Sequence, residues 1–169
     1  MRLKKLWSAS ALAAALALSA PTFAGEQAAA VLKDGAGKEV GQVMLLAVPS
    51  GVLIDANLSA VPPGDHGFHI HEVGKCEPPD FESAGGHFNP EEDQHGLMTE
   101  AGPHAGDLPN IHVPETGKLR IEMLHQLVSL QGLFDDDGSA IVIHEGPDDY
   151  MTDPSGNAGA RIACGIIVE

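Results

Sequence analysis

Histidine is the residue type in this chain with the greatest capacity for chemistry, because nine of its 169 residues are histidines. His69 and His71 lie in the stretch GFHIH, where a single residue separates them. In a β-strand, side chains two positions apart point to the same face, so both imidazoles can reach one metal ion while Phe68 and Ile70 point to the core. By itself the pair is a weak indication, since two surface histidines also occur at this spacing by chance.

Further candidate ligands follow this pair along the chain. One of them ends an apolar run that is typical of a strand, and the others lie in a long loop: His144 on the strand, and His87, His95, His104 and Asp107 in the loop. Three histidines and one carboxylate make a closed tetrahedral zinc site, whereas three or four histidines in a more open site suit copper. The spacing predicts two complementary metal sites, with solvated loop histidines as the alternative.

The elements that must position these ligands are predicted to be short β-strands. Alternating or continuous apolar residues indicate strands over 52–59, 119–123, 140–143 and 162–168. Turn residues gather at 34–37, 61–64 and 135–138. No long amphipathic helix and no internal repeat interrupts this pattern. The fold class is therefore all-β, an antiparallel sandwich or barrel.

One stretch, residues 74–114, breaks the strand pattern and contains mostly glycine, proline, acidic residues and histidines. A loop of this length is either disordered or functional, and it needs something to order it. Its composition favours a bound metal.

Length and charge narrow the function classes further. A chain of 169 residues is long enough for one compact domain, and its 43% apolar content is typical of a folded protein. Twenty-four acidic residues against nine basic ones give a formal net charge of −15. This balance argues against a nucleic-acid partner, because nucleic-acid recognition needs a basic surface.

The first 24 residues are predicted to be a secretory signal peptide. Arg2, Lys4 and Lys5 precede an uncharged apolar run over 6–20, and the segment ends in small residues at Ala24. The apolar run is short for a membrane span, so a cleaved signal is favoured over an uncleaved anchor. Cleavage predicts a periplasmic protein without membrane attachment.

The mature domain would span residues 25–169, with a charge of −18 once the three cations of the signal are removed from −15. Its two cysteines, Cys76 and Cys164, most simply pair with each other in an oxidising compartment. Two free thiols are the alternative, which such a compartment disfavours.

Four motifs carry a resemblance to a known family, and together they span most of the mature chain. They are GFHIHE at 67–72, GHFNP at 86–90, GPHAGDLPN at 102–110 and GNAGARIACG at 156–165. From about residue 28 to its C-terminus the chain resembles the Cu,Zn superoxide dismutases, specifically the exported bacterial kind.

The resemblance implies a role for each candidate residue. The implied ligands are His69, His71, His87 and His144 for copper, and His87, His95, His104 and Asp107 for zinc, with His87 shared between the two ions. It also implies that Asp148 links His69 to His95, that Arg161 beside the copper attracts superoxide, that His66 is a structural histidine behind the site, and that Cys76 and Cys164 form a disulfide. His112 and His125 have no implied role, and we predict ordinary surface or loop positions for them.

The implied fold is an eight-stranded antiparallel Greek-key barrel with long metal-binding and electrostatic loops. The implied reaction is the dismutation of superoxide to dioxygen and hydrogen peroxide by a redox-cycling copper, bridged through His87 to a structural zinc. A non-catalytic periplasmic copper- and zinc-binding module is the alternative. A homodimer is possible, and the sequence leaves it open.

The chain departs from better-known relatives in the loop before Arg161. Those relatives guide the anion with lysines, whereas residues 145–160 of this chain contain four acidic residues and no lysine or arginine. We therefore expect Arg161 and the metals to attract superoxide, with Lys75 as a further candidate.

Overall fold

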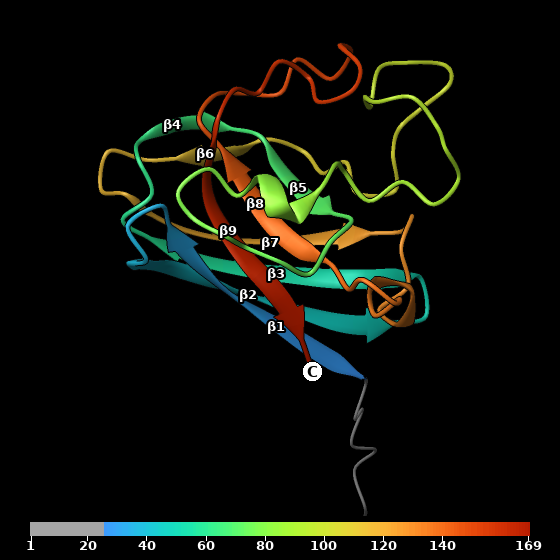
Figure 1. Cartoon of the computed structure of the whole chain (residues 1–169), viewed down its shortest axis with the longest axis horizontal. Coiled ribbons are helices and arrows are strands. Elements are labelled where there is room, and N and C mark those ends of the chain that lie inside the picture. Colours follow the sequence, from blue (N-terminus) through green and yellow to red (C-terminus); the bar gives the residue numbers. More distant parts are fainter. Residues whose placement is uncertain (1–25) are drawn as a thin grey trace, which may run out of the picture.

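A computed structural model describes residues 26–169 of the chain, and within this range the fold is all-β (Figure 1). Nine strands follow one another: β1 (Gln27–Asp34), β2 (Glu39–Val48), β3 (Gly51–Ser59), β4 (Gly64–His66), β5 (Phe68–His71), β6 (Ile111–Val113), β7 (Lys118–His125), β8 (Ala140–His144) and β9 (Arg161–Val168). The helical elements are single 3₁₀ turns, η1 (Glu82–Ala84) and η2 (Gln131–Leu133). None of the helices in residues 26–169 is long and apolar enough to cross a membrane.

Seven strands form one curled antiparallel sheet in the order β5-β8-β9-β1-β2-β3-β7, and β4 pairs with β6 in a separate small sheet. The residues from Gly64 to His71 run through both sheets, because β4 pairs with β6 and β5 pairs with β8. The switch falls at Gly67, whose N–H donates to the carbonyl of Gly146. Counted as one strand that changes partner, this segment gives the eight strands that were predicted.

Strand patterning agrees with the sequence in the central elements. In β3 the side chains of Val52, Ile54, Ala56 and Leu58 are fully buried, as the alternation predicts. All five residues of β8 are buried, in agreement with its continuous apolar run. Burial of these faces supplies the hydrophobic stabilisation of the core.

The stretch over 74–114 was predicted to hold no strand, and this is wrong at its C-terminal end. Ile111–Val113 forms β6 in an antiparallel pair with β4. Ile111 and Val113 are buried while His112 between them is exposed, so the alternation is real but only three residues long. Three residues are too few for the pattern to stand out in a sequence.

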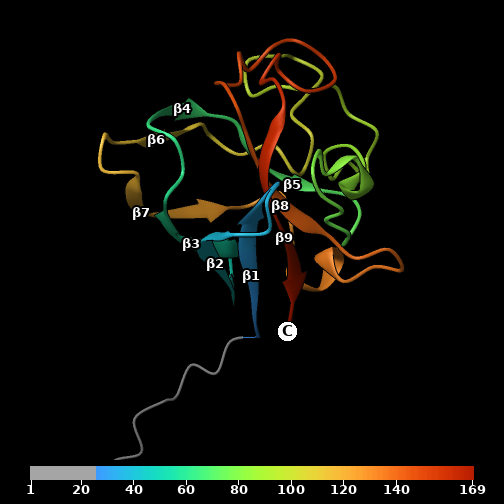
Figure 2. The ribbon, with the colours of Figure 1, turned by 60° about the vertical axis from the view of Figure 1, so that its left-hand side comes forward.

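The long loops gather at one end of the curled sheet. The segment before β9, coloured red, and the loop after η1, coloured yellow-green, lie together at the top in both views (Figures 1 and 2). Strand β9 begins at this end of the sheet (Figure 1). The sheet is therefore a rigid base from which β5, β8 and β9 present side chains to the two loops.

Candidate metal centre

Eight ligand positions, filled by seven side chains, form two groups at the loop end of the sheet. In each group the four ligand atoms lie within 4.8 Å of one another, and all the residues are buried: His69, His71, His87 and His144 in the first group, and His87, His95, His104 and Asp107 in the second. His87 belongs to both groups. These are the two sets that the resemblance implied as ligands.

Strand geometry explains the first group. On β5, Phe68 and Ile70 enter the hydrophobic core, so the alternating positions His69 and His71 face away from it. β8 is the neighbour of β5, and His144 ends it at a register shift opposite Arg161. The rigid sheet therefore supplies three of the four histidines.

The nitrogens of the first group divide into those with a protein partner and those that face the group. His69 Nε2 contacts Asp148 at 2.8 Å, and His71 Nδ1 donates to the carbonyl of Gly85 at 3.0 Å. The remaining nitrogen of His71, Nε2, lies 3.4 Å from His144 Nε2. His69 Nδ1 and His87 Nε2 are buried without any hydrogen-bond partner. Buried polar atoms without partners are rare, and converging imidazole nitrogens fit copper.

Asp107 organises the second group. Its Oδ1 lies 2.7 Å from His87 Nδ1, 3.1 Å from His95 Nδ1 and 3.5 Å from His104 Nδ1. Its Oδ2 accepts the backbone N–H groups of Gly96 and His104, which fixes the carboxylate. His104 Nδ1 has no hydrogen-bond partner although it is buried. Three histidine nitrogens around one carboxylate oxygen fit a tetrahedral zinc ion.

Asp148 connects the two groups from outside. Its Oδ2 contacts His69 Nε2 at 2.8 Å, and its Oδ1 contacts His95 Nε2 at 3.0 Å. A carboxylate that accepts from the outer nitrogen of an imidazole fixes the tautomer, so the inner nitrogen keeps its lone pair for a metal. This is the linking position that the resemblance implied for Asp148.

Burial and hydrogen bonds set the charge of these residues. Burial lowers the pKa of His69 to about 4 and that of His144 to about 3, so both are neutral near pH 7. Burial also opposes charge on His95, but its hydrogen bonds to Asp107 and Asp148 outweigh this and raise its pKa to about 9. Burial raises the pKa of Asp107, but its hydrogen bonds to His87, His95 and Gly96 hold it well below the usual range.

Comparison with known proteins identifies the family. A sequence model described as copper/zinc superoxide dismutase matches residues 40–167. The chain belongs to the copper/zinc superoxide dismutase family. It is 52% identical over 137 residues to superoxide dismutase [Cu-Zn] 1 of Aquifex aeolicus, covering 78% of this chain and 81% of that protein.

Solved structures of superoxide dismutase relatives share the fold. A superoxide dismutase-like protein from Bacillus subtilis superimposes with a TM-score of 0.77 at 41% identity, covering 83% of this chain and 97% of that one. The Cu/Zn superoxide dismutase from Brucella abortus gives a TM-score of 0.72 at 31% identity, covering 85% of this chain and all of that one. The all-β Greek-key class predicted from the sequence is therefore confirmed.

The first group opens on a cavity of about 490 Å³. His71, His87 and His144 line it, together with Arg161. A small anion can therefore reach the first group from solvent. His104 of the second group also lines the cavity. Of the two basic residues that sequence analysis named as attracting superoxide, Arg161 lines this cavity and Lys75 does not.

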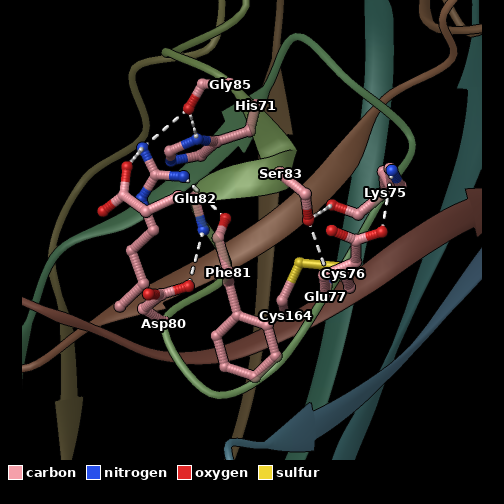
Figure 3. The surroundings of a disulfide bond; sticks show 11 residues. His71, Lys75, Cys76, Glu77, Asp80, Phe81, Glu82, Ser83, Gly85 and Cys164 are labelled. Carbon is pink, nitrogen blue, oxygen red and sulfur yellow. Dashed lines mark hydrogen bonds and ion pairs between the residues drawn. A yellow bond between two sulfur atoms is a disulfide. The ribbon is translucent and has the colours of Figure 1, made fainter.

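Arg161 is held by two backbone carbonyls of the loop that the disulfide anchors. Figure 3 labels the two acceptor residues, Phe81 and Gly85, together with Cys76 and Cys164. Arg161 Nη1 donates to the carbonyl of Phe81 and Arg161 Nη2 to the carbonyl of Gly85, both at 2.7 Å. The predicted disulfide between Cys76 and Cys164 is confirmed, with a Cα–Cα distance of 5.7 Å. It ties this loop to β9, the strand that begins with Arg161. Neither carbonyl could have been predicted from sequence motifs, because a backbone acceptor carries no residue signature.

Lys75 precedes the disulfide cysteine Cys76 (Figure 3), and it does not line the cavity. Its ammonium pairs with Glu77 at 2.8 Å, and both side chains are exposed. The position of Lys75 therefore does not support the expectation that it helps attract superoxide. Its side chain lies outside the cavity lining, and its charge is paired with the Glu77 carboxylate.

The three histidines outside the two groups differ in their surroundings. His66 is buried and contacts the carbonyls of His144 and Pro62 at 2.8 Å each, which fits the structural position implied for it. His112 is exposed and pairs with Asp65, as predicted for a surface residue. The prediction for His125 is wrong, because it ends β7 in the interior and its Nε2 contacts the carbonyl of Ala105 at 2.6 Å.

Proposed function

We propose that the chain dismutates superoxide, with one copper and one zinc held by the two side-chain groups. In this assignment His69, His71, His87 and His144 hold copper, and His87, His95, His104 and Asp107 hold zinc. The observation that carries it is His87, whose buried Nε2 has no protein partner and whose Nδ1 lies 2.7 Å from Asp107 in the second group. One imidazole therefore serves both groups, one nitrogen for each.

The overall reaction converts two superoxide anions and two protons to one dioxygen and one hydrogen peroxide. Bound copper supplies the one-electron redox chemistry by alternating between two oxidation states, while zinc has no redox change. The chain's own residues bind the anion, hold the ligands in place and handle protons.

Arg161 is the residue that binds the anion in this proposal. It lines the cavity with His71, His87 and His144, and its guanidinium is fixed by two carbonyls, so it does not have to be ordered when the substrate arrives. A fixed cation beside the reacting atoms raises the local concentration of an anionic substrate.

His87 is placed to carry a proton at Nε2. His87 lines the cavity, while Asp107 fixes the ring through Nδ1. The ring therefore keeps its position whether or not Nε2 is protonated. The peroxide product takes up protons, and a proton held at Nε2 of this cavity-lining residue is placed to be transferred to it.

A metal-binding module without turnover is the second candidate, and the cavity disfavours it. Storage of a metal ion needs no open path to the first group and no fixed arginine beside it. This chain has both, together with the complete set of histidines.

The compartment forms part of the proposal. We infer that residues 1–24 are a cleaved signal peptide, that the mature domain is residues 25–169, and that the enzyme is periplasmic without membrane attachment. The predicted signal lies outside the described residues. The disulfide supports an oxidising compartment, since disulfides persist there and are rare in the cytosol. Sedimentation of the mature chain tests the homodimer that the sequence leaves open.

The test is reconstitution of the mature chain, residues 25–169, first stripped of metal and then loaded with one copper and one zinc. Superoxide dismutation should appear only after copper is added and should be lost in His144→Ala, which is expected to keep its zinc. His112→Ala, which changes an exposed histidine outside both groups, should remain as active as the wild type. Tight stoichiometric binding of both metals without turnover would contradict the proposal and favour the binding module.

A further inference from the structure

Tyr150 is the only tyrosine of the chain, and each of its polar groups has a partner. Its N–H donates to Asp148 Oδ1 at 2.6 Å, and its carbonyl accepts the N–H of Met98 at 3.1 Å. Its hydroxyl oxygen accepts the N–H of Asn110 at 2.7 Å. The residue lies in the loop between β8 and β9, so these contacts join that loop to two other segments.

Both of those segments carry members of the second group. Asn110 follows Asp107 by three residues, and the Tyr150 carbonyl packs against Gly96, the residue after His95. A Cβ on Gly96 would overlap this carbonyl, and its backbone has a φ of +111°, so glycine is required there. The N–H of Gly96 in turn donates to Asp107 Oδ2 at 2.9 Å.

Asn110 continues the connection to the carboxylate that links the two groups. Its Nδ2 donates to the carbonyl of Asp148 and its Oδ1 accepts the N–H of Asp148, each at 2.8 Å. Tyr150 therefore holds Asp148 directly through its N–H and indirectly through Asn110. Asp148 in turn contacts His69 and His95.

The backbone of Tyr150 has a left-handed conformation, with a φ of +62°. A bulky residue rarely adopts this conformation, and it persists only where the surroundings hold it. In this conformation the N–H, the carbonyl and the ring can reach three different segments at once.

We propose that Tyr150 is a positioning residue of the zinc site. Its hydroxyl and its backbone clamp the loop before β9 onto Asn110 and Gly96, so that the Asp148 carboxylate stays aligned on His95. Partners that orient a metal-bound histidine raise metal affinity, and Tyr150 acts on zinc through such a partner. This inference rests on the zinc assignment in the proposed function.

The test uses Tyr150→Phe in the mature chain loaded with copper and zinc, because this change keeps the ring and removes only the hydroxyl acceptor. Zinc release to a chromophoric chelator should become about tenfold faster, at the lower end of the effect of outer partners of metal ligands, because Tyr150 acts on His95 through Asp148. Copper retention should change less than the zinc release rate. Met151→Leu is the matched control, because it changes an exposed side chain at the next position of the same loop.

A second readout needs no activity and no variant. Trp7 is the only tryptophan and lies in the predicted signal, so Tyr150 dominates the ultraviolet emission of the mature chain. Zinc added to the metal-free protein should change this emission and saturate at one zinc per chain. Unchanged Tyr150 emission would overturn the proposal.

Failure of the inference can be distinguished from failure of the zinc assignment. If His104→Ala binds zinc as the wild type does, the assignment itself is wrong. If zinc binding requires His104 but Tyr150→Phe releases zinc at the rate of Met151→Leu, the positioning role is overturned. An equal loss of copper and zinc, with a matching fall in stability of the metal-free protein, would also overturn it.

Discussion

His71 and Arg161 donate to the same acceptor, the carbonyl oxygen of Gly85. The distances are 3.0 Å from His71 Nδ1 and 2.7 Å from Arg161 Nη2. One backbone atom therefore orients a proposed copper ligand and the proposed anion-binding cation. A displacement of Gly85 would therefore disturb both side chains at once.

Replacing Arg161 should reduce activity without removing copper. In Arg161→Ala, kcat/KM for superoxide should fall about tenfold or more, because a fixed cation in the cavity is lost. Arg161→Lys should recover only part of it, since one ammonium cannot donate to Phe81 O and Gly85 O in the way a guanidinium fork does. Pulse radiolysis and metal analysis of the same samples measure the two quantities. Equal activity in all three proteins would exclude Arg161 from anion binding.

Removing the disulfide should affect stability and activity together. Its cysteines are separated by 88 positions, and the chain-entropy model assigns about 4–5 kcal/mol to a loop of this length. Replacing Cys76 and Cys164 by serine should lower the free energy of unfolding in urea by an amount of that order. kcat/KM should also fall, because the loop that carries the Arg161 acceptors is released from β9. A variant as stable as the wild type would contradict the entropic account.

The acidic residues of the cavity should make kcat/KM for superoxide rise with ionic strength. Among the described residues that line the cavity, Glu82, Asp93 and Asp153 are acidic and Arg161 is the single lysine or arginine. Glu82 Oε2 lies 3.9 Å from Arg161 Nη2, so this carboxylate offsets the charge that attracts the anion. Salt screens the repulsion between these carboxylates and the superoxide anion, so kcat/KM should rise about twofold between about 10 mM and about 200 mM ionic strength.

The matched variants separate Glu82 from the general negative charge. Glu82→Gln should raise kcat/KM about twofold to threefold at low ionic strength and flatten the salt dependence. Glu115→Gln removes the same charge at an exposed position that does not line the cavity, and it should change little. A rate that falls steeply with salt in the wild type would show that the metals and Arg161 dominate the approach of the anion.

The metal-free protein should lose stability on both sides of about pH 6.5. Burial lowers the pKa of His69 to about 4 and of His144 to about 3, so between pH 6.5 and 4 the unfolded chain binds protons that the folded chain does not. This lowers the stability as the pH falls, by about 3 kcal/mol for His69 alone. The pKa of His95 is raised to about 9, so its contribution is present below pH 6.5 and is lost as the pH rises through 9.

Urea unfolding of the metal-free mature chain at several pH values measures this dependence. His144→Asn should weaken the acid side of the profile, because a group that takes up a proton only in the unfolded state has been removed. His112→Ala should leave the profile unchanged, since that side chain is exposed. A profile without an acid-side decrease would contradict burial of neutral histidines.

The sequence by itself determined the chemistry of this protein. Spacing places the imidazoles of His69 and His71 on one face, because side chains at positions i and i+2 of a strand must share a face. The family motifs then name the members of both side-chain groups. The alternation in β3 and the apolar run of β8 identify the sheet that carries them, and two cysteines are enough to predict one disulfide. These inferences depend on local geometry, which adjacent residues fix.

Tertiary structure decided which residues hold the ligands in place. The contacts of Arg161 with Phe81 and Gly85 span 80 and 76 positions, and they involve backbone carbonyls, which every residue has. Only the path of the chain shows that Lys75 pairs with Glu77 outside the cavity and that His125 lies in the interior. The physical reason is that burial and charge pairing depend on which segments the fold brings together. Short-range sequence patterns do not specify these contacts between distant segments.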